Sequence, residues 1–436
     1  MDAVTNNLTT LKNSVDESAV NWVSQNTAVL VVHGIGNQLP LETLDSFGRG
    51  LIKQYKMADY ELSVTHELVT KPAGEGKDAW FDNTLRLKIA GSPYYIDLYE
   101  YYWANYTEDK ADSDDIAKWL NGVVKGASSF YSEQKNAELG KRYKDESPFF
   151  SKKGTLNRRR YKLFLFSTRH FFTFIRTLYK GLLRLIGLIP VVGNWAKSVI
   201  EDIEKSEEAN FNNIIGDIVV YNVTDPKCKY YSVRRDILDS GVKALKYLIE
   251  TGEQSGLPLY PSVIVAGHSL GTQVSYDVIN KINLMINKGQ ISNYSNDGCH
   301  KISKKPISSQ LNGFITFGSP LDKIAFFLRE VVPDENYLRQ QMLDDYHGFK
   351  QQDWSLNNKN INYTKVRNTL ARFLDGILWR NYFDGHDPVS GALDYYKNLT
   401  NIDCRFKAKA GRLSFTHSDY WNCDDFYRDI ISHFFR

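Results

Sequence analysis

Residues 261–286 read PSVIVAGHSLGTQVSYDVINKINLMI, and this stretch decides the fold class. An apolar, β-branched run at 263–266 comes first and is typical of a strand buried on both faces of a parallel sheet. A glycine turn follows at once, and apolar residues then recur at helical spacing over 272–286. Strand, glycine turn and helix in this order predict an α/β fold with a parallel sheet.

The same alternation continues on both sides of this stretch. Helical spacing predicts further helices at 42–55 and 423–436. Apolar or alternating runs predict further strands at 28–32, 61–69, 84–90, 94–103, 312–320, 377–384 and 411–421. Repeated units of this kind indicate a doubly wound α/β fold with a mostly parallel sheet.

Composition excludes several classes of protein. The chain has 436 residues, 42% hydrophobic and 24% charged, which is ordinary for a globular protein and excludes disordered or collagen-like chains. The formal net charge is only +3, so we expect no nucleic-acid partner. The four cysteines are scattered without a CxxC pair, which indicates free thiols and no zinc site. The polar N-terminus lacks the apolar run of a signal peptide, so we expect a cytoplasmic location.

Residues 107–210 interrupt the alternation and divide the chain into three parts. We expect 1–106 to form the first part of the α/β core, and 211–436 to form its remainder. The part between them is helical in pattern, aromatic and locally basic. Its basic residues between positions 158 and 184 are Arg158, Arg159, Arg160, Lys162, Arg169, Arg176, Lys180 and Arg184.

Two interpretations of this insertion stay open. Its longest uncharged stretch, 185–196, is too short for the roughly 20 residues of a membrane-spanning helix. One interpretation is an interfacial helix, peripheral on a membrane, with Phe and Leu facing lipid and Arg and Lys near the headgroups. The other is a lid or cap packed against the core, and one segment can serve both purposes.

Gly267-His268-Ser269-Leu270-Gly271 matches the G-x-S-x-G nucleophile elbow. A serine on a tight strand-to-helix turn has a strained backbone, and small residues on both sides let neighbouring strands pass closely. The turn exposes the hydroxyl, and the following helix N-terminus offers backbone N–H groups to developing negative charge. The competing interpretation, a phosphate loop, lacks the required lysine.

A second glycine turn, His33-Gly34-Ile35-Gly36, follows the strand predicted at 28–32. It lacks the third glycine of a dinucleotide-binding fingerprint, because Leu39 stands there. It suits an oxyanion hole instead, with the backbone N–H of Ile35, or alternatively Gly36, beside that of Leu270. We expect His33 to be a structural histidine that hydrogen-bonds loop backbone.

The serine needs a base that follows it in the chain. Of the nine histidines, only His386, His417 and His433 lie late enough. His417 closely follows the apolar LSF run at 413–415, and a side chain just after the end of a strand would project over the edge of the sheet. We therefore expect His417 to be the base and the other two to be bystanders.

The base needs an orienting acid, and Asp387 is the first choice. It follows the strand predicted at 377–384, and Pro388 fixes the turn after it. Asp384 is the alternative, and Asp322 is a weaker third choice. The gap between Asp387 and His417 leaves room for a crossover helix and one more strand.

The chain resembles lipase-type α/β-hydrolases. Its motif layout is most similar to intracellular phospholipases A1 that prefer phosphatidic acid, and to inositol-deacylase and bacterial lipase-like proteins. The matching pieces are VVHGIGNQ, EYYWA, IGDIVVYNV, VIVAGHSLGTQVSYDVI, ITFGSPL, WRNYFDGHDPVSG and FTHSDYW. The resemblance implies an α/β-hydrolase fold with a helical lid insertion, and ester hydrolysis by Ser269, His417 and Asp387. It extends neither to 107–210 nor to a metal-binding DDHD-type region, which the chain lacks.

These residues predict a serine-dependent ester hydrolase that acts on a phospholipid or another lipid, without metal or organic cofactor. The first alternative is an esterase, thioesterase or acyltransferase with a small soluble substrate. The second is a catalytically inactive, membrane-binding protein on a hydrolase scaffold.

Overall fold

The computed structural model describes residues 7–15, 20–34, 39–68, 83–107, 130, 220–222, 228–251, 258–291, 309–327, 336, 338–339, 342, 369–387, 389–406 and 416–436. Apart from Thr107 and Phe130, the insertion at 107–210 lies outside these residues, as do Ile35, Gly36 and Pro388.

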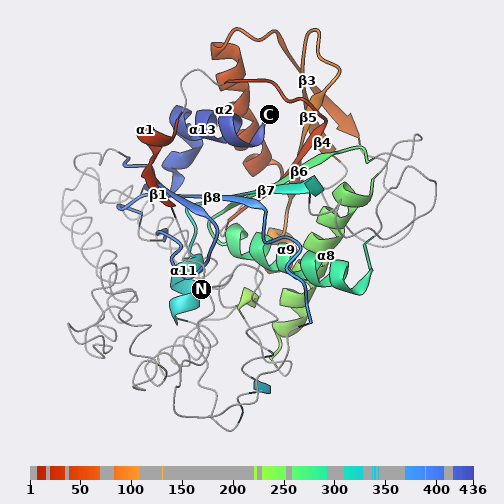
Figure 1. Ribbon diagram of the computed structural model, residues 1–436, viewed down its shortest axis with the longest axis vertical. Helices are drawn as coiled ribbons and strands as arrows, with labels where there is room; N and C mark the ends of the chain where they lie inside the picture. The colour runs from red at the N-terminus through yellow and green to blue at the C-terminus, as the bar shows by residue number, and fades with distance from the viewer. Residues whose placement is uncertain are drawn as a thin grey trace, which may run out of the picture.

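A mostly parallel sheet forms the centre of the molecule (Figure 1). In the described part of the chain it has nine strands, in the spatial order β1-β9-β8-β7-β6-β2-β5-β4-β3. Neighbouring strands are parallel except for the β3–β4 and β4–β5 pairs. The strands are β1 (Asn7–Thr10), β2 (Thr27–Val32), β3 (Leu62–Leu68), β4 (Asn83–Ile89), β5 (Tyr95–Tyr101), β6 (Ser262–His268), β7 (Leu311–Phe317), β8 (Leu378–Phe383) and β9 (Thr400–Asp403).

Helices cover both faces of this sheet. In Figure 1, α1, α2 and α13 lie on one side of the sheet and α8 and α9 on the other. The described helices are α1 (Leu11–Ser14), α2 (Glu42–Met57), α3 (Ala104–Thr107), α8 (Tyr231–Glu250), α9 (Gly271–Lys288), α11 (Leu321–Phe327), the 3₁₀ helix η3 (Thr416–Asn422) and α13 (Asp424–Phe434).

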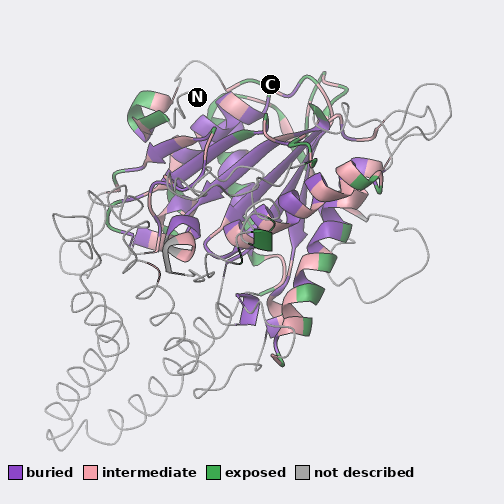
Figure 2. Cartoon of the chain, turned by 60° about the horizontal axis from the view of Figure 1, so that its bottom comes forward, coloured by how far each residue is buried: buried purple, intermediate pink, exposed green. Residues whose placement is uncertain are grey.

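Strand β2 shows why the sheet needs two layers of helices. All six of its residues are buried, and they alternate between two apolar cores. Ala28, Leu30 and Val32 pack on the side of α8 and α9, whereas Val29 and Val31 pack on the side of α2 and α13. Figure 2 shows the same arrangement, with buried strands between helices whose exposed residues face outward. The continuous apolar run is therefore confirmed as a strand buried on both faces.

Most predicted elements are present, but the sequence does not predict β1, α1 or α8, and further differences lie near the end of the chain. The gap between Asp387 and His417 leaves room for a crossover helix, but the described residues 389–399 carry none. The additional strand is β9, and the irregular segment before it is held by the Asp322 carboxylate, which accepts the Asp394 and Tyr395 N–H groups. His417 lies in η3 and not at the end of a strand, and residues 407–415 lie outside the described residues.

The carboxyl ends of four neighbouring strands meet at one edge of the sheet. Val32 pairs with Gly267, His268 with Phe317, and Phe317 with Tyr382. The residues that follow β2, β6, β7 and β8 therefore lie side by side. In open α/β sheets this edge is where ligands bind.

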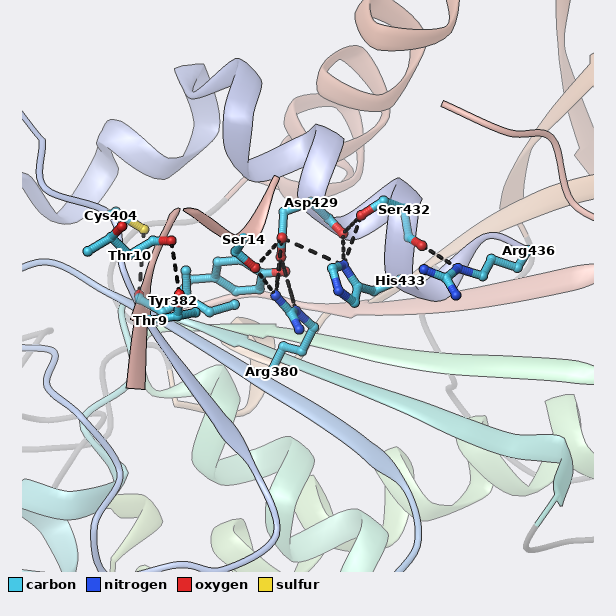
Figure 3. A network of polar contacts seen from close by, with 11 residues as sticks. Thr9, Thr10, Ser14, Arg380, Tyr382, Cys404, Asp429, Ser432, His433 and Arg436 are labelled. Atoms are coloured by element: carbon cyan, nitrogen blue, oxygen red, sulfur yellow. Dashed lines mark hydrogen bonds and ion pairs between the residues drawn. The ribbon is translucent and has the colours of Figure 1, made fainter. Parts of the chain in front are cut away.

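A buried polar network joins both ends of the chain to β8 (Figure 3). Arg380 on β8 pairs with Asp429 on α13 at 2.9 Å, and both side chains are almost fully buried. Ser14 on α1 donates to Asp429 at 2.6 Å and also bonds Arg380, and the Tyr382 hydroxyl donates to Asp429 at 2.5 Å. Because each charge has several partners, the network fixes α1 and α13 against the sheet.

None of the helices that the structure describes is both long and apolar enough to cross a membrane.

Candidate active site

Ser269 occupies a strained turn between β6 and α9. Its φ angle is +52°, in the left-handed region that non-glycine residues rarely adopt and that costs about 1–3 kcal/mol. The turn is held in place because Ser269 N–H donates to the Phe317 carbonyl at 3.1 Å. Thr272 adds a second fixing contact, since its hydroxyl donates to the Ser269 carbonyl at 2.7 Å. The strand, turn and helix that the G-x-S-x-G motif requires are therefore all present.

Two glycines allow the end of β2 to approach this turn. A Cβ atom at Gly34 would lie 2.7 Å from Ser269 Cβ, and one at Gly271 would lie 2.2 Å from the His33 carbonyl oxygen. Both distances are too short for any side chain, so only glycine permits this packing. The glycine turn that begins at Gly34 therefore starts against Ser269. Its proposed oxyanion donor, Ile35, lies outside the described residues, whereas Leu270 directly precedes α9.

His417 and Asp387 form a hydrogen-bonded pair. His417 Nδ1 lies 2.9 Å from Asp387 Oδ2, and the Asp387 side chain is fully buried. Because the carboxylate can only accept, Nδ1 carries the hydrogen and Nε2 is the basic nitrogen when the ring is neutral. The order of the three residues in the chain is Ser269, Asp387, His417.

The Asp387 carboxylate has further donors around it. Its Oδ1 accepts the Val389 N–H at 2.9 Å, and its Oδ2 accepts the Tyr420 hydroxyl at 3.2 Å. Burial alone would raise the pKa of Asp387, but its hydrogen bond with His417, the charge of that imidazole and the Val389 N–H outweigh burial and lower the pKa to about 2. The carboxylate is therefore ionised at any pH where the protein would work.

The two other candidate acids bond elsewhere. Asp384 accepts the His386 N–H at 2.9 Å, the Phe406 N–H at 2.8 Å and the Thr416 hydroxyl at 2.9 Å. Asp322 holds the backbone of 394–395, as described above. The structure therefore brings Asp387, and neither alternative, into hydrogen-bond contact with the His417 ring.

His33 has the structural role expected from the sequence. Its Nδ1 donates to the Gly34 carbonyl at 2.7 Å, and its Nε2 accepts the backbone N–H groups of Trp103 and Ala104. Desolvation in this fully buried position lowers the pKa of His33 to about 4. The ring therefore stays neutral and holds the end of β2 against the segment after β5. His386 is largely exposed, and His433 lies on α13 in the network of Figure 3.

Gly318 and His268 connect His417 to the turn at Ser269. Gly318 follows Phe317, which bonds Ser269 N–H, and a Cβ atom at Gly318 would lie 2.9 Å from His417 Cε1. The rings of His268 and His417 have centroids 4.8 Å apart. No group in the described part of the chain hydrogen-bonds Ser269 Oγ, although that atom is buried. A buried hydroxyl without a partner is uncommon in folded proteins.

Sequence reasoning missed three residues around His417. Tyr420 contacts Asp387, Thr416 contacts Asp384, and the His268 ring contacts the His417 carbonyl. The spacing of His417 and Tyr420 places them together only in the 3₁₀ helix, whereas the sequence predicts a strand over 411–421. No local signal pointed to Thr416 or His268, since their partners are distant in sequence.

The buried titratable groups make stability depend on pH. His33 and His268, with pKa values lowered by desolvation to about 4 and about 3, resist protonation when folded but take up a proton below about 6.5 when unfolded. Glu100, which is buried behind the N-terminus of α2, acts oppositely, because burial raises its pKa to about 7 and the folded state retains a proton there. As pH falls from 6.5 to 4.5, the unfolded state therefore comes to bind about one more proton than the folded state.

We expect the free energy of unfolding to fall by about 1 kcal/mol per pH unit as pH is lowered from 6.5 to 4.5. Glu100→Gln keeps a hydrogen-bond acceptor for α2 but removes the opposing titration, so the free energy of unfolding should then fall by about 2 kcal/mol per pH unit. Urea unfolding followed by tryptophan fluorescence at pH 4.5, 5.5 and 6.5 measures both slopes. Equal slopes for the two proteins would contradict this assignment.

The described side chains offer acyl-transfer chemistry and no metal centre. Within the described ranges, no group of three or more His, Cys, Asp or Glu side chains could hold a metal ion. A strained serine, an imidazole and a buried carboxylate are the parts that a covalent acyl-enzyme mechanism uses.

Comparisons with known proteins add no identity, because no family model, curated protein or solved structure matches the chain.

Proposed function

We propose that the chain is a serine-dependent carboxylic-ester hydrolase of the α/β-hydrolase type that acts on lipid. The observation that carries this proposal is that Ser269 and the Asp387–His417 pair follow strands whose carboxyl ends meet at one edge of the sheet, where Gly318 lies against the His417 ring and follows the residue that binds Ser269 N–H. Two further features support it. Nucleophile, acid and base follow β6, β8 and β9 in the order of that fold, and the glycine turn after β2 begins against Ser269.

In the proposed reaction, Ser269 Oγ attacks the ester carbonyl while His417 Nε2 takes the hydroxyl proton. Asp387 keeps the imidazole in the required tautomer and stabilises the positive charge that develops on it. The backbone N–H groups of Leu270 and Ile35 would bind the oxyanion. His417 then protonates the leaving alcohol, and water releases the carboxylic acid from the acyl-enzyme.

The lipid part of the proposal rests on the sequence of the insertion and on the resemblance to phospholipases A1. An enzyme for small soluble esters has no need of a basic, aromatic segment of this size. Incubation with vesicles of mixed phospholipids, followed by mass spectrometry, tests it. We expect free fatty acid and lysophospholipid from the wild-type protein and neither from Ser269→Ala.

The other outcomes of this experiment separate the alternatives. Turnover of p-nitrophenyl butyrate without release of fatty acid from vesicles would contradict the lipid substrate and favour a small soluble one. Absence of turnover on both substrates would contradict the hydrolase itself and leave a binding protein on the same scaffold.

The insertion is also expected to bind anionic membranes. Each of its basic residues near an anionic surface contributes up to about 1 kcal/mol, an attraction that salt screens. Flotation with phosphatidylglycerol vesicles should therefore carry the protein upward at low salt and less so at high salt. Replacing Arg158, Arg159 and Arg160 with Glu should weaken flotation while sparing turnover of p-nitrophenyl butyrate.

The opposite result has a clear meaning. If the insertion is purely an internal cap, the wild-type protein will not float even at low salt. The triple replacement will then lower thermal stability and soluble-ester turnover together, because its arginines pair with the core.

A further inference from the structure

The backbone around His417 is held by two side chains that do not touch its imidazole nitrogens. The first is Asp384, a buried carboxylate directly after β8. It binds the Phe406 N–H at 2.8 Å and the Thr416 hydroxyl at 2.9 Å. Asp384 therefore joins two points of the chain that are ten residues apart, and the second point is the residue before His417.

The second side chain is that of His268, directly before Ser269. Its Nε2 lies 3.1 Å from the His417 carbonyl oxygen. Because a carbonyl only accepts, His268 Nε2 carries the hydrogen. The ring also packs against those of Phe317 and Trp421, each with centroids 5.0 Å away. Desolvation and the nearby His417 lower the pKa of His268 to about 3, so this donor stays in the neutral form.

We infer that Asp384 and His268 are positioning residues that fix the backbone of His417 from both sides and thereby align its imidazole with Ser269. This inference rests on the proposed function. The hydrogen bond to Asp387 fixes one nitrogen of the ring, but the place of the ring also depends on where the backbone of η3 lies. A short 3₁₀ helix has poor internal hydrogen-bond geometry, so contacts from outside must hold it.

A misplacement of about 1 Å in a catalytic group can lower the rate about 100-fold. Loss of either contact should therefore lower kcat by about 10- to 100-fold. KM should change little, because neither contact involves the substrate.

The test removes one hydrogen bond at a time. Thr416→Val removes the hydroxyl that Asp384 binds, whereas Thr416→Ser keeps it. Thr84→Val is the matched control, because Thr84 is equally buried and its hydroxyl donates to the Leu98 carbonyl on β5, across the β4–β5 pair. His268→Phe keeps an aromatic ring but removes the N–H that binds the His417 carbonyl, whereas His268→Gln keeps an N–H donor.

With p-nitrophenyl butyrate, we expect Thr416→Val and His268→Phe to lose kcat, and Thr416→Ser and His268→Gln to recover most of it. Thr84→Val should lose thermal stability but keep kcat. If Thr416→Val and Thr84→Val behave alike, with lower stability and unchanged kcat, the positioning role is wrong.

A spectroscopic measurement separates this inference from the proposed function. The proton between His417 Nδ1 and Asp387 should give a downfield ¹H NMR signal that is absent from His417→Gln. We expect the signal to persist in Thr416→Ser and Thr84→Val and to broaden or disappear in Thr416→Val. If the wild-type protein turns over no ester, the hydrolase proposal fails, and this signal alone decides the positioning role. An unchanged signal in Thr416→Val overturns it.

Discussion

Replacing Ser269 with alanine is expected to abolish ester hydrolysis, with a loss of about 10⁴–10⁶ in turnover. The change removes the nucleophile and almost no volume. It should not lower stability, because Ser269 Oγ is a buried atom without a hydrogen-bond partner in the described part of the chain. Removing a buried, unsatisfied hydroxyl is neutral or favourable for folding. We therefore expect an inactive protein whose Tm is equal to or above that of the wild type.

The measurement combines turnover, thermal unfolding and labelling with a fluorophosphonate probe, followed by peptide mapping. The probe should label the wild-type protein at Ser269 only. Ser432→Ala is the matched control, because Ser432 is also buried but its hydroxyl donates to the Asp429 carbonyl at 2.9 Å, on α13. This variant should lose stability and keep both labelling and turnover. Labelling that persists in Ser269→Ala would exclude Ser269 as the nucleophile.

The parts of the fold that the sequence predicts are those whose signal is local. β2 and β6 are buried on both faces of the sheet, so each is a continuous apolar run. That run is enough to predict a buried strand from the sequence. The strained turn at Ser269 likewise follows from five consecutive residues. The strand, turn and helix around Ser269 could therefore be predicted without any knowledge of distant contacts.

Two strands at one edge of the sheet, β1 and β9, could not be predicted from local sequence. β1 (NLTT) and β9 (TNID) are short and polar, and neither has the apolar run of a strand. They form because Asn7 pairs with Thr400, almost four hundred residues away in the chain. Because both segments are short and polar, neither has an apolar periodicity, and no local pattern predicts their pairing.

The acid of the site is an intermediate case. Asp384 and Asp387 are three residues apart after the same strand, and local sequence leaves both open as the partner of His417. Their hydrogen bonds distinguish the two carboxylates, because Asp384 accepts the Phe406 N–H and the Thr416 hydroxyl and not the His417 ring. Those contacts depend on how the segments after β9 and before His417 return to the sheet, and that path is set by tertiary packing.

Asp387→Asn is expected to lower kcat/KM about 10⁴-fold at neutral pH. An amide cannot satisfy the neighbours of this carboxylate in either orientation. If its nitrogen replaces Oδ2, it faces His417 Nδ1 and the Tyr420 hydroxyl, and it favours the wrong imidazole tautomer. If its nitrogen replaces Oδ1, it faces the Val389 N–H, so two donors oppose each other. In both cases the charge that stabilises the imidazolium is lost.

Two other carboxylates at the same edge of the sheet serve as controls for that variant. Asp322→Asn disturbs a buried carboxylate that accepts two backbone N–H groups but does not contact His417, so it should lower Tm and keep turnover within a few-fold. Asp384→Asn should lower kcat/KM more than Asp322→Asn and less than Asp387→Asn. It loosens the backbone before His417, but the imidazole keeps its hydrogen bond to Asp387. The order of the three effects on kcat/KM therefore assigns the roles: if Asp384→Asn loses as much as or more than Asp387→Asn, the acid of the proposed triad is Asp384, and the 2.9 Å contact between Asp387 and His417 is structural.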